Sequence, residues 1–350
     1  MKKVIFGGRI FASLILFWGA SSCRRSVSVP MHVYSGYAQG TTFQVTYDTL
    51  AGILDREISD IFSKMDKACS LYDSNSAIVR FNRAVEKAEV DTLMASVLML
   101  SKKIYQETHG AFNPAVFPLV KMWGFGPQGS QGPPISSVVV PTGDSLKSLI
   151  NLEGIFLDTT EDGKIWCHKK VPHLQLDFNG IAQGYTVDLI CGLLEKKGAR
   201  NYLVEVGGEV RASGLNPQGQ PWRIGIEKPT DHNLERQLYA VVNLSDMAMA
   251  TSGSYRKFYI QEGVRRSHTI SPFTGRPVTH NLLSVTVFCS TCARADALAT
   301  AFMVMGNTGT LSWLRQHPGY EVFMISSGYQ QSYITYASEG IKSRLEAIRP

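Results

Sequence analysis

The hydrophobic positions along this chain follow two different periods. In residues 43–47 apolar and polar side chains alternate, which is typical of a strand with one buried face. In residues 58–69 and 92–108 apolar side chains instead recur every three or four positions, which is typical of an amphipathic helix. The first part of the chain is therefore predicted to contribute one strand and two helices to the core.

The rest of the chain combines two further helices with many short strands. Residues 182–197 predict a helix that ends at Gly198, and residues 294–305 predict an apolar, buried helix. The predicted strands cover residues 174–178, 202–206, 222–226, 238–244, 283–288, 322–326 and 332–336. Helices interspersed with short strands favour an α+β fold of mixed, largely antiparallel sheets over a regular doubly wound sheet.

Residues 37–350 contain no feature that divides them into separate units. They have no internal repeat and no long linker, and residues 126–134 are typical of a surface loop. A length of 350 residues with 44% hydrophobic and 18% charged composition is ordinary for a folded protein and argues against disorder or a coiled coil. We therefore expect residues 37–350 to form a single domain, built as one unit or as two intimate subdomains.

The N-terminus carries a different pattern. A lysine pair precedes an apolar run at residues 10–18 and small residues at 19–22, which is typical of a secretory signal. The run is too short for a comfortable membrane span, and Cys23 after small residues resembles a bacterial lipobox, whose cysteine is lipidated. We expect a signal peptide at residues 1–22, a lipid anchor on Cys23, a tether over residues 23–36, and export to a bacterial membrane with the domain facing the periplasm.

Charge and cysteine content exclude some partners and cofactors. The formal net charge is +6, but lysines and arginines are scattered and form no basic stripe with interleaved aromatics, so nucleic-acid binding is not expected. Cys289 and Cys292 have the spacing of a redox or zinc site, yet a zinc site needs a second ligand pair that is missing nearby. We expect small buried cysteines, or one local disulfide.

Asp296 and Thr300 lie four positions apart on a predicted helix and therefore project from one face. Their oxygens could share a hard cation such as Mg²⁺, which is usually held by one or two carboxylates together with other oxygen ligands. Taken alone, such a pair is more often a helix-start carboxylate and a hydroxyl bonded to its own backbone.

Three other segments carry candidate chemistry. Residues 177–184 run from a predicted strand through Asn-Gly-Ile-Ala-Gln-Gly into a helix, where free amides favour phosphate, although the glycines could also serve packing alone. Residues 268–277 place His268 on a rigid turn, as a proton-transfer residue or a structural histidine. Residues 250–255 are either a phosphate cradle or a polar turn. None contains a G-x-G-x-x-G fingerprint.

In this order, these segments resemble the bacterial ApbE-type FAD:protein FMN transferases. The resemblance covers nearly the whole chain after residue 37. It rests on motifs at residues 39–43, 70–72, 81–82, 110–114, 118–126, 176–185, 206–209, 221–226, 250–253, 268–277 and 295–298.

The resemblance implies roles for individual residues. Mg²⁺ would be held by the carbonyl of Ala182 and the side chains of Asp296 and Thr300, and His268 matches a histidine important for catalysis. The positions implied to contact FAD are Gln39, Tyr72, Ala111, Phe112, Asn113, Asn179, Tyr185 and Ile270. The chain departs from the family pattern where Gln39 replaces Met, Asn113 replaces Asp, Gln183 replaces Lys and Ser271 replaces Asp.

The resemblance also implies an activity for residues 37–350. A Mg²⁺-dependent enzyme would transfer FMN from FAD to a Ser or Thr hydroxyl of exported acceptor flavoproteins of electron-transfer systems, releasing AMP. Two alternatives remain open at this point. One is a metal-dependent FAD pyrophosphatase that yields FMN and AMP, and the other is a lipoprotein that binds flavin without chemistry.

Overall fold

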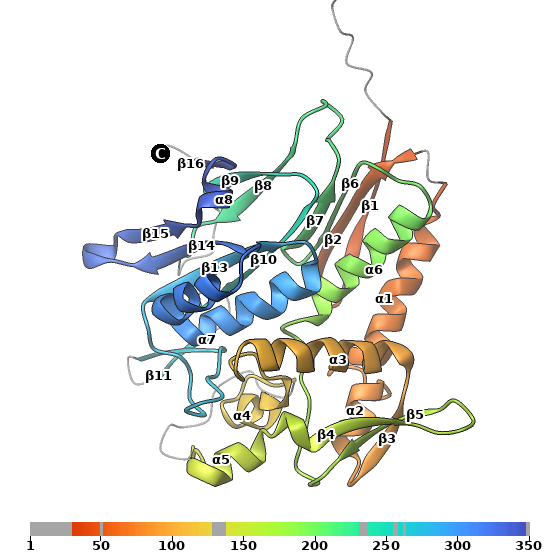
Figure 1. Cartoon of the computed structure of the whole chain (residues 1–350), viewed down its shortest axis with the longest axis vertical. Helices are drawn as coiled ribbons and strands as arrows, with labels where there is room; N and C mark the ends of the chain where they lie inside the picture. Colours follow the sequence, from red (N-terminus) through yellow and green to blue (C-terminus); the bar gives the residue numbers. More distant parts are fainter. Residues whose placement is uncertain are drawn as a thin grey trace, which may run out of the picture.

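The fold is built on one large antiparallel sheet (Figure 1). The computed structural model describes residues 30–49, 52–127, 138–230, 237–254, 258–261 and 264–347. Within them, eight strands pair in the order β1-β2-β6-β7-β10-β13-β14-β15, and every neighbouring pair is antiparallel. The strands are β1 Met31–Ala38, β2 Thr41–Asp48, β6 Tyr202–Val206, β7 Glu209–Ser213, β10 Met247–Gly253, β13 Leu282–Cys289, β14 Glu321–Ser327 and β15 Tyr333–Ala337.

A smaller sheet covers one face of the large sheet. It comprises β8 (Trp222–Glu227), β9 (Leu238–Leu244) and β16 (Leu345–Ala347), with the short helix α8 (Glu339–Lys342) beside it (Figure 1). Alternate residues of β9 are buried, as expected for a strand with one face on the core. They pack in a hydrophobic cluster that also contains Phe288 of β13.

Helices cover the opposite face. Helices α6 (Ala182–Lys196) and α7 (Cys292–Gln316) pack against β6, β7, β10 and β13, and α1 (Asp55–Cys69) packs against α6. Gly306 has φ 66° inside α7 and interrupts the helix close to where the sequence predicts its end. A side chain there would be strained by this backbone conformation and would also meet the His280 ring, which explains the glycine.

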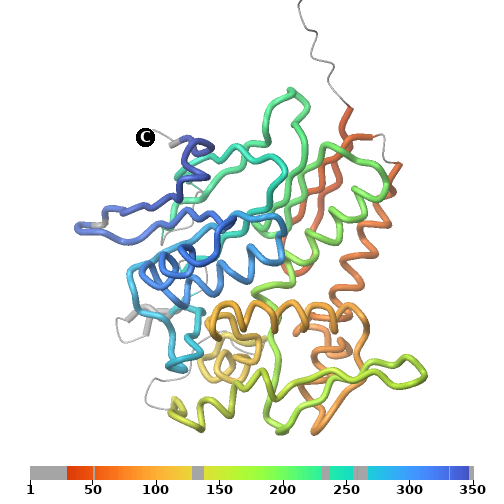
Figure 2. The backbone as a smooth tube through the Cα atoms, viewed as in Figure 1, coloured from red at the N-terminus to blue at the C-terminus, as the bar shows by residue number. Residues whose placement is uncertain are grey.

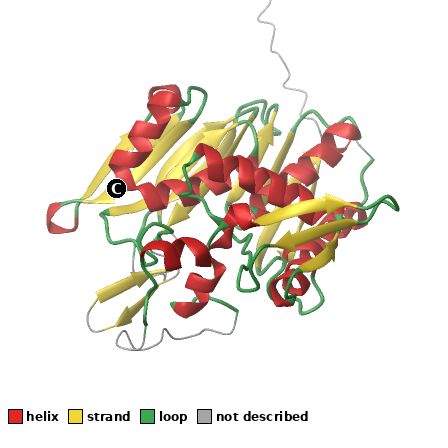
Figure 3. Cartoon of the chain, turned by 60° about the horizontal axis from the view of Figure 1, so that its bottom comes forward, coloured by secondary structure: helices red, strands yellow, loops and turns green. Residues whose placement is uncertain are grey.

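Helices α2–α5 and the small sheet β3-β5-β4 lie beneath α7 in Figure 1, and this side of the molecule is turned forward in Figure 3. The main hydrophobic cluster includes residues of both α3 and α7, so this region shares one core with the large sheet. The continuous backbone trace in Figure 2 passes repeatedly between the two regions. The remaining elements are α2 Ala77–Arg83, β3 Lys87–Val90, α3 Thr92–Glu107, Pro114–Val116 (3-10), α4 Phe117–Met122, α5 Gly143–Leu149, Leu152–Gly154 (3-10), β4 Ile155–Thr159, β5 Ile165–Lys169, β11 Phe258–Gln261, β12 Val264–Ser267 and Tyr329–Gln331 (3-10).

The predicted α+β fold is confirmed, and α3, α6, β6 and β9 agree with their predicted ranges to within a residue. One predicted strand is wrong: residues 174–178 form no strand and pair with none. Instead, the Asn82 side chain donates to the carbonyl of Leu176 (2.8 Å) and accepts from its amide (2.7 Å). A side chain thus replaces a neighbouring strand as the hydrogen-bond partner.

Three other predictions require comment. The predicted tether is too long, because residues 31–36 belong to β1 and pair with β2. Residues 1–29, which include the predicted signal peptide and Cys23, lie outside the described residues. Residues 250–253 are part of β10 and not a polar turn. The five cysteines in the described part of the chain are free and buried, so the local disulfide is not formed. No described helix has the length and hydropathy of a membrane span.

Candidate functional site

The functional site lies where the start of α6 meets α7. The amide of Gly184 donates a hydrogen bond to Asp296 Oδ2 across 3.1 Å. A Cβ on Gly184 would lie 2.5 Å from the carbonyl oxygen of Cys292, and a Cβ on Gly180 would lie 2.8 Å from Thr300 Oγ1. The glycines of the predicted phosphate-binding segment are therefore required for close approach to α7, and Asp296 and Thr300 share a helix face as predicted.

Asp296 is a buried acid in an environment that does not stabilise its charge. Burial raises the pKa of its carboxyl to about 7, although the Gly184 amide acts in the opposite direction. Among the side chains that the structure describes, no lysine or arginine forms an ion pair with it. A buried carboxylate of this kind is costly unless a cation joins it.

The oxygens around Asp296 suit a hard cation. Thr300 Oγ1 lies one helical turn away, and Ser252 Oγ of β10 lies 3.5 Å from it. No group of three or more His, Cys, Asp or Glu side chains in the described part of the chain could enclose a metal. One carboxylate with hydroxyl groups fits Mg²⁺, which keeps waters and binds substrate phosphates, better than it fits zinc.

Most of the predicted site residues line one cavity of ≈ 280 Å³ beside this crossing. The predicted residues among its walls are Tyr72, Ala111, Phe112, Asn113, Asn179, His268, Ile270, Asp296 and Thr300. The sequence analysis did not assign a role to several other wall residues, namely Val116, Val120, Phe125, Asp177 and Glu209. A larger cavity of ≈ 630 Å³ lies on the other side of α4, but none of the predicted site residues lines it.

One wall of the cavity is apolar and aromatic. Phe112 and Asn113 come from the turn between α3 and α4, and Phe125 follows α4. Asn113 accepts from the amide of Ala115 (2.9 Å) and donates to the carbonyl of Ile150 (3.0 Å). Since both ends of its side-chain amide bind the backbone, Asn113 holds the shape of this wall.

The loop that carries His268 is rigidly held. Ser271 donates its amide to the carbonyl of Arg276 (2.9 Å), and the Trp123 indole donates to the carbonyl of Gly275 (2.8 Å). Gly275 has φ 67°, and a Cβ there would lie 2.6 Å from Val140. His268 itself meets Phe125 edge to face, with ring centroids 6.4 Å apart. The histidine is thus presented to the cavity by a fixed turn.

Three predicted residues do not line the cavity: Gln39, Ala182 and Tyr185. Gln39 Nε2 donates to Thr186 Oγ1 (2.8 Å), which in turn donates to the carbonyl of Ala182 (2.8 Å). The carbonyl that the resemblance assigns to Mg²⁺ therefore accepts a hydroxyl donor along α6. Tyr185 packs against the main core instead. The sequence shows Thr186 only as a polar helix residue, so it offered no signal for this relay.

These observations define an α+β protein with a cleft in which a buried acid, hydroxyl groups and an aromatic wall converge. The ApbE family model matches residues 39–324. The chain is 36% identical over 340 residues to a FAD:protein FMN transferase of Vibrio cholerae, covering 95% of this chain and 96% of that protein. It is 37% identical over 285 residues to that of Escherichia coli K12, covering 80% and 78%.

Solved structures agree with the sequence comparison. Flavin Transferase ApbE from Vibrio cholerae is similar with a TM-score of 0.74 and 34% identity, over 90% of this chain and 99% of that one. The apo form of the Pseudomonas stutzeri flavinyl transferase ApbE gives a TM-score of 0.73 and 31% identity, over 90% and 96%. The chain belongs to the ApbE family.

Proposed function

We propose that this protein transfers FMN from FAD to a hydroxyl group of another protein and releases AMP. Its Vibrio cholerae relative named FAD:protein FMN transferase matches it over 96% of that protein's length. The observation that carries the proposal is the cavity where residues from eight separate motifs, between Tyr72 and Asp296, come together. A family resemblance without this convergence would leave the chemistry unsupported.

The reaction is a phosphoryl transfer with a simple balance. The bond between the FMN phosphorus and the bridging oxygen of FAD breaks, and the phosphorus forms a new bond to the acceptor's Ser or Thr oxygen. AMP leaves with the bridging oxygen, and the hydroxyl proton passes to a base. His268 is that base or orients it, because it is the histidine on the cavity wall.

Asp296 and Thr300 are the side chains that would hold Mg²⁺. The buried carboxylate, with its raised pKa, gains most from a cation, and Thr300 adds a neutral oxygen on the same helix face. When bound, Mg²⁺ would neutralise charge on the phosphate oxygens. Three of the first four amides of α6 already donate hydrogen bonds, those of Ala182 and Tyr185 to backbone carbonyls and that of Gly184 to Asp296, so the phosphates would be held mainly through the ion.

The apolar wall suits the ring systems of FAD. Phe112 and Phe125 offer aromatic surface, Val116 and Val120 offer aliphatic surface, and Tyr72 is 72% exposed at the rim. An isoalloxazine or adenine ring can pack on such a wall while its phosphates reach Asp296. The cavity also remains open, as transfer to another protein requires.

The cellular setting is part of the proposal. The signal-like residues 1–22 and Cys23 support export and lipid anchoring at a bacterial membrane, with the domain facing the periplasm. The acceptors would then be exported flavoproteins of electron-transfer systems. Metabolic labelling with a radioactive fatty acid, compared between the full chain and Cys23→Ala, tests the anchor; equal label in both would contradict it.

The activity is tested by incubating the protein with FAD, Mg²⁺ and an exported electron-transfer protein that carries a Ser/Thr flavinylation motif. We expect a covalent FMN mass on the acceptor and an equal amount of AMP, both abolished by a chelator. FMN and AMP in equal amounts without an adduct would identify a pyrophosphatase. FAD binding without any AMP would identify a flavin-binding protein.

A further inference from the structure

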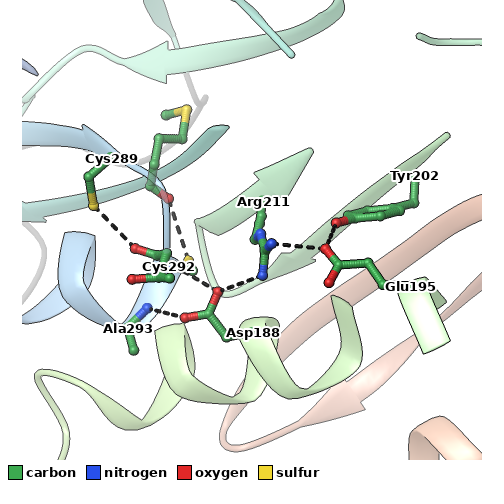
Figure 4. Close-up of polar contacts among 9 residues, drawn as sticks. Asp188, Glu195, Tyr202, Arg211, Cys289, Cys292 and Ala293 are labelled. Atoms are coloured by element: carbon green, nitrogen blue, oxygen red, sulfur yellow. Dashed lines mark hydrogen bonds and ion pairs between the residues drawn. The ribbon is translucent and has the colours of Figure 1, made fainter. Parts of the chain in front are cut away.

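A second contact joins α6 to α7 next to the site. Asp188 of α6 accepts hydrogen bonds from the amides of Cys292 and Ala293, each at 2.9 Å (Figure 4). These are the first two residues of α7, whose own N-cap residue, Thr291, makes no side-chain cap bond. Helix α7 is therefore capped by a carboxylate from another helix.

The two contacts between the helices form a clamp. Gly184 and Asp188 are four positions apart on α6, and Cys292 and Asp296 are four positions apart on α7. Asp188 holds the start of α7, and one turn further on Asp296 accepts from Gly184. One turn is about 5.4 Å, so α7 cannot slide or rotate against α6 without breaking one of these bonds.

The clamp is tied to the large sheet through Arg211. Arg211 Nη1 of β7 lies 3.3 Å from Asp188 Oδ1, and Nη2 lies 2.9 Å from Glu195 Oε1, which also accepts from the Tyr202 hydroxyl (Figure 4). Burial raises the pKa of Asp188, while the two α7 amides and Arg211 lower it. Asp188 is thus a partly buried acid with three donors, none of which lines the cavity.

We propose that Asp188 is a positioning residue of the transfer reaction: it fixes Asp296 and Thr300 against the 179–184 segment by clamping the start of α7. The proposal rests on the proposed function, since it concerns the same cation and phosphate site. An ordinary helix cap would affect the stability of α7 alone. A positioning role predicts a specific loss of cation affinity beyond that effect.

The test compares Asp188→Asn with Glu195→Gln. Both variants remove one negative charge next to Arg211, but only Asp188 touches α7. In Asp188→Asn, one of the two acceptors becomes a donor, so one α7 amide loses its partner. Mg²⁺ binding is measured by calorimetry on the flavin-free protein, together with kcat, KM for FAD and Tm. We expect Asp188→Asn to weaken Mg²⁺ binding by about tenfold or more, and Glu195→Gln to bind like the wild type.

A third variant separates positioning from capping. Asp188→Asn combined with Thr291→Asp supplies a local N-cap to α7 and allows folding if the single variant is unstable. We expect the double variant to regain Tm while Mg²⁺ binding stays weak. Recovery of both Tm and Mg²⁺ binding in the double variant would overturn the proposal. Equal Mg²⁺ affinity in Asp188→Asn and Glu195→Gln would also overturn it. A wild-type protein that binds no Mg²⁺ would instead overturn the proposed metal site, on which this inference depends.

Discussion

The amide of Gly184 and the carboxylate of Asp296 are joined by a 3.1 Å hydrogen bond, although 112 positions separate them in the chain. This bond merges two candidate features, a glycine-rich turn and an acid–hydroxyl pair on a helix, into one site. It also places an acid against the first turn of α6.

Asp296→Asn should change how stability depends on pH in metal-free protein. The pKa of Asp296 is raised from 3.8 to about 7 in the folded state, so the folded protein binds more protons and loses stability as pH rises across that window. The variant lacks this loss and should be more stable than the wild type above about pH 7. Thermal unfolding with a chelator at a series of pH values measures the difference.

Added Mg²⁺ should reverse this order. We expect the ion to raise the Tm of the wild type and to leave Asp296→Asn unchanged, with FMN transfer lost in the variant. Asp246→Asn is the control. Hydrogen bonds from Gly214 and Ser213 lower the pKa of the Asp246 carboxyl, so loss of this carboxylate should destabilise the protein at neutral pH. Equal Mg²⁺ stabilisation of Asp296→Asn and wild type would contradict the metal assignment.

Gly184→Ala should force α6 and α7 apart. Its Cβ would lie 2.5 Å from the carbonyl oxygen of Cys292 and 2.8 Å from Asp296 Cβ, so we expect a loss of about 1–3 kcal/mol in the free energy of unfolding, together with weaker Mg²⁺ binding. Gly192→Ala in the same helix meets no atom within 4 Å and should gain about 0.5–1 kcal/mol. Chemical denaturation measures both; a stable Gly184→Ala would show that the helices do not pack this closely.

His268→Ala should slow FMN transfer without preventing FAD binding. If His268 moves or orients the acceptor proton, kcat should fall by about 10²–10⁴-fold, while flavin fluorescence titration should change little. His173→Ala is the matched control, because the His173 ring lies 3.2 Å from the carbonyl oxygen of Ser148 and does not line the cavity. Unchanged turnover in His268→Ala would remove this residue from the mechanism.

Gln183→Lys should increase the affinity of the protein for FAD. Gln183 lines the cavity at the start of α6, where an ammonium group would meet the phosphates and strengthen a hydrogen bond by roughly 1 kcal/mol. We therefore expect KM for FAD to fall about fivefold, with kcat nearly unchanged. The gain should shrink at high ionic strength because the added interaction is a charge attraction. A KM that does not respond to this substitution would place Gln183 away from the phosphates.

Much of the fold could be predicted from local periodicity, and some of it could not. The helices α3 and α6 were found because buried and exposed residues follow the helical period. Residues 31–36 of β1 fall in the predicted tether because every residue of this edge strand is partly or fully exposed, so no buried face marks it in the sequence. In residues 174–178 a strand is predicted where none forms. Leu174, Leu176 and Phe178 are buried at alternate positions, as in a strand, but the Asn82 side chain bonds the backbone of Leu176 in place of a partner strand.

The sequence by itself determined the α+β class, the ApbE resemblance and the shared face of Asp296 and Thr300, because helical and strand periods and the order of motifs are local properties of the chain. Only the tertiary structure decided that Asp296 meets Gly184, that Asp188 caps α7, and that Ala182 is tied to Gln39 through Thr186. These relationships depend on how closely α6 and α7 pack. Side chains far apart in the chain come into contact there, and burial then sets the cost of every charge between them.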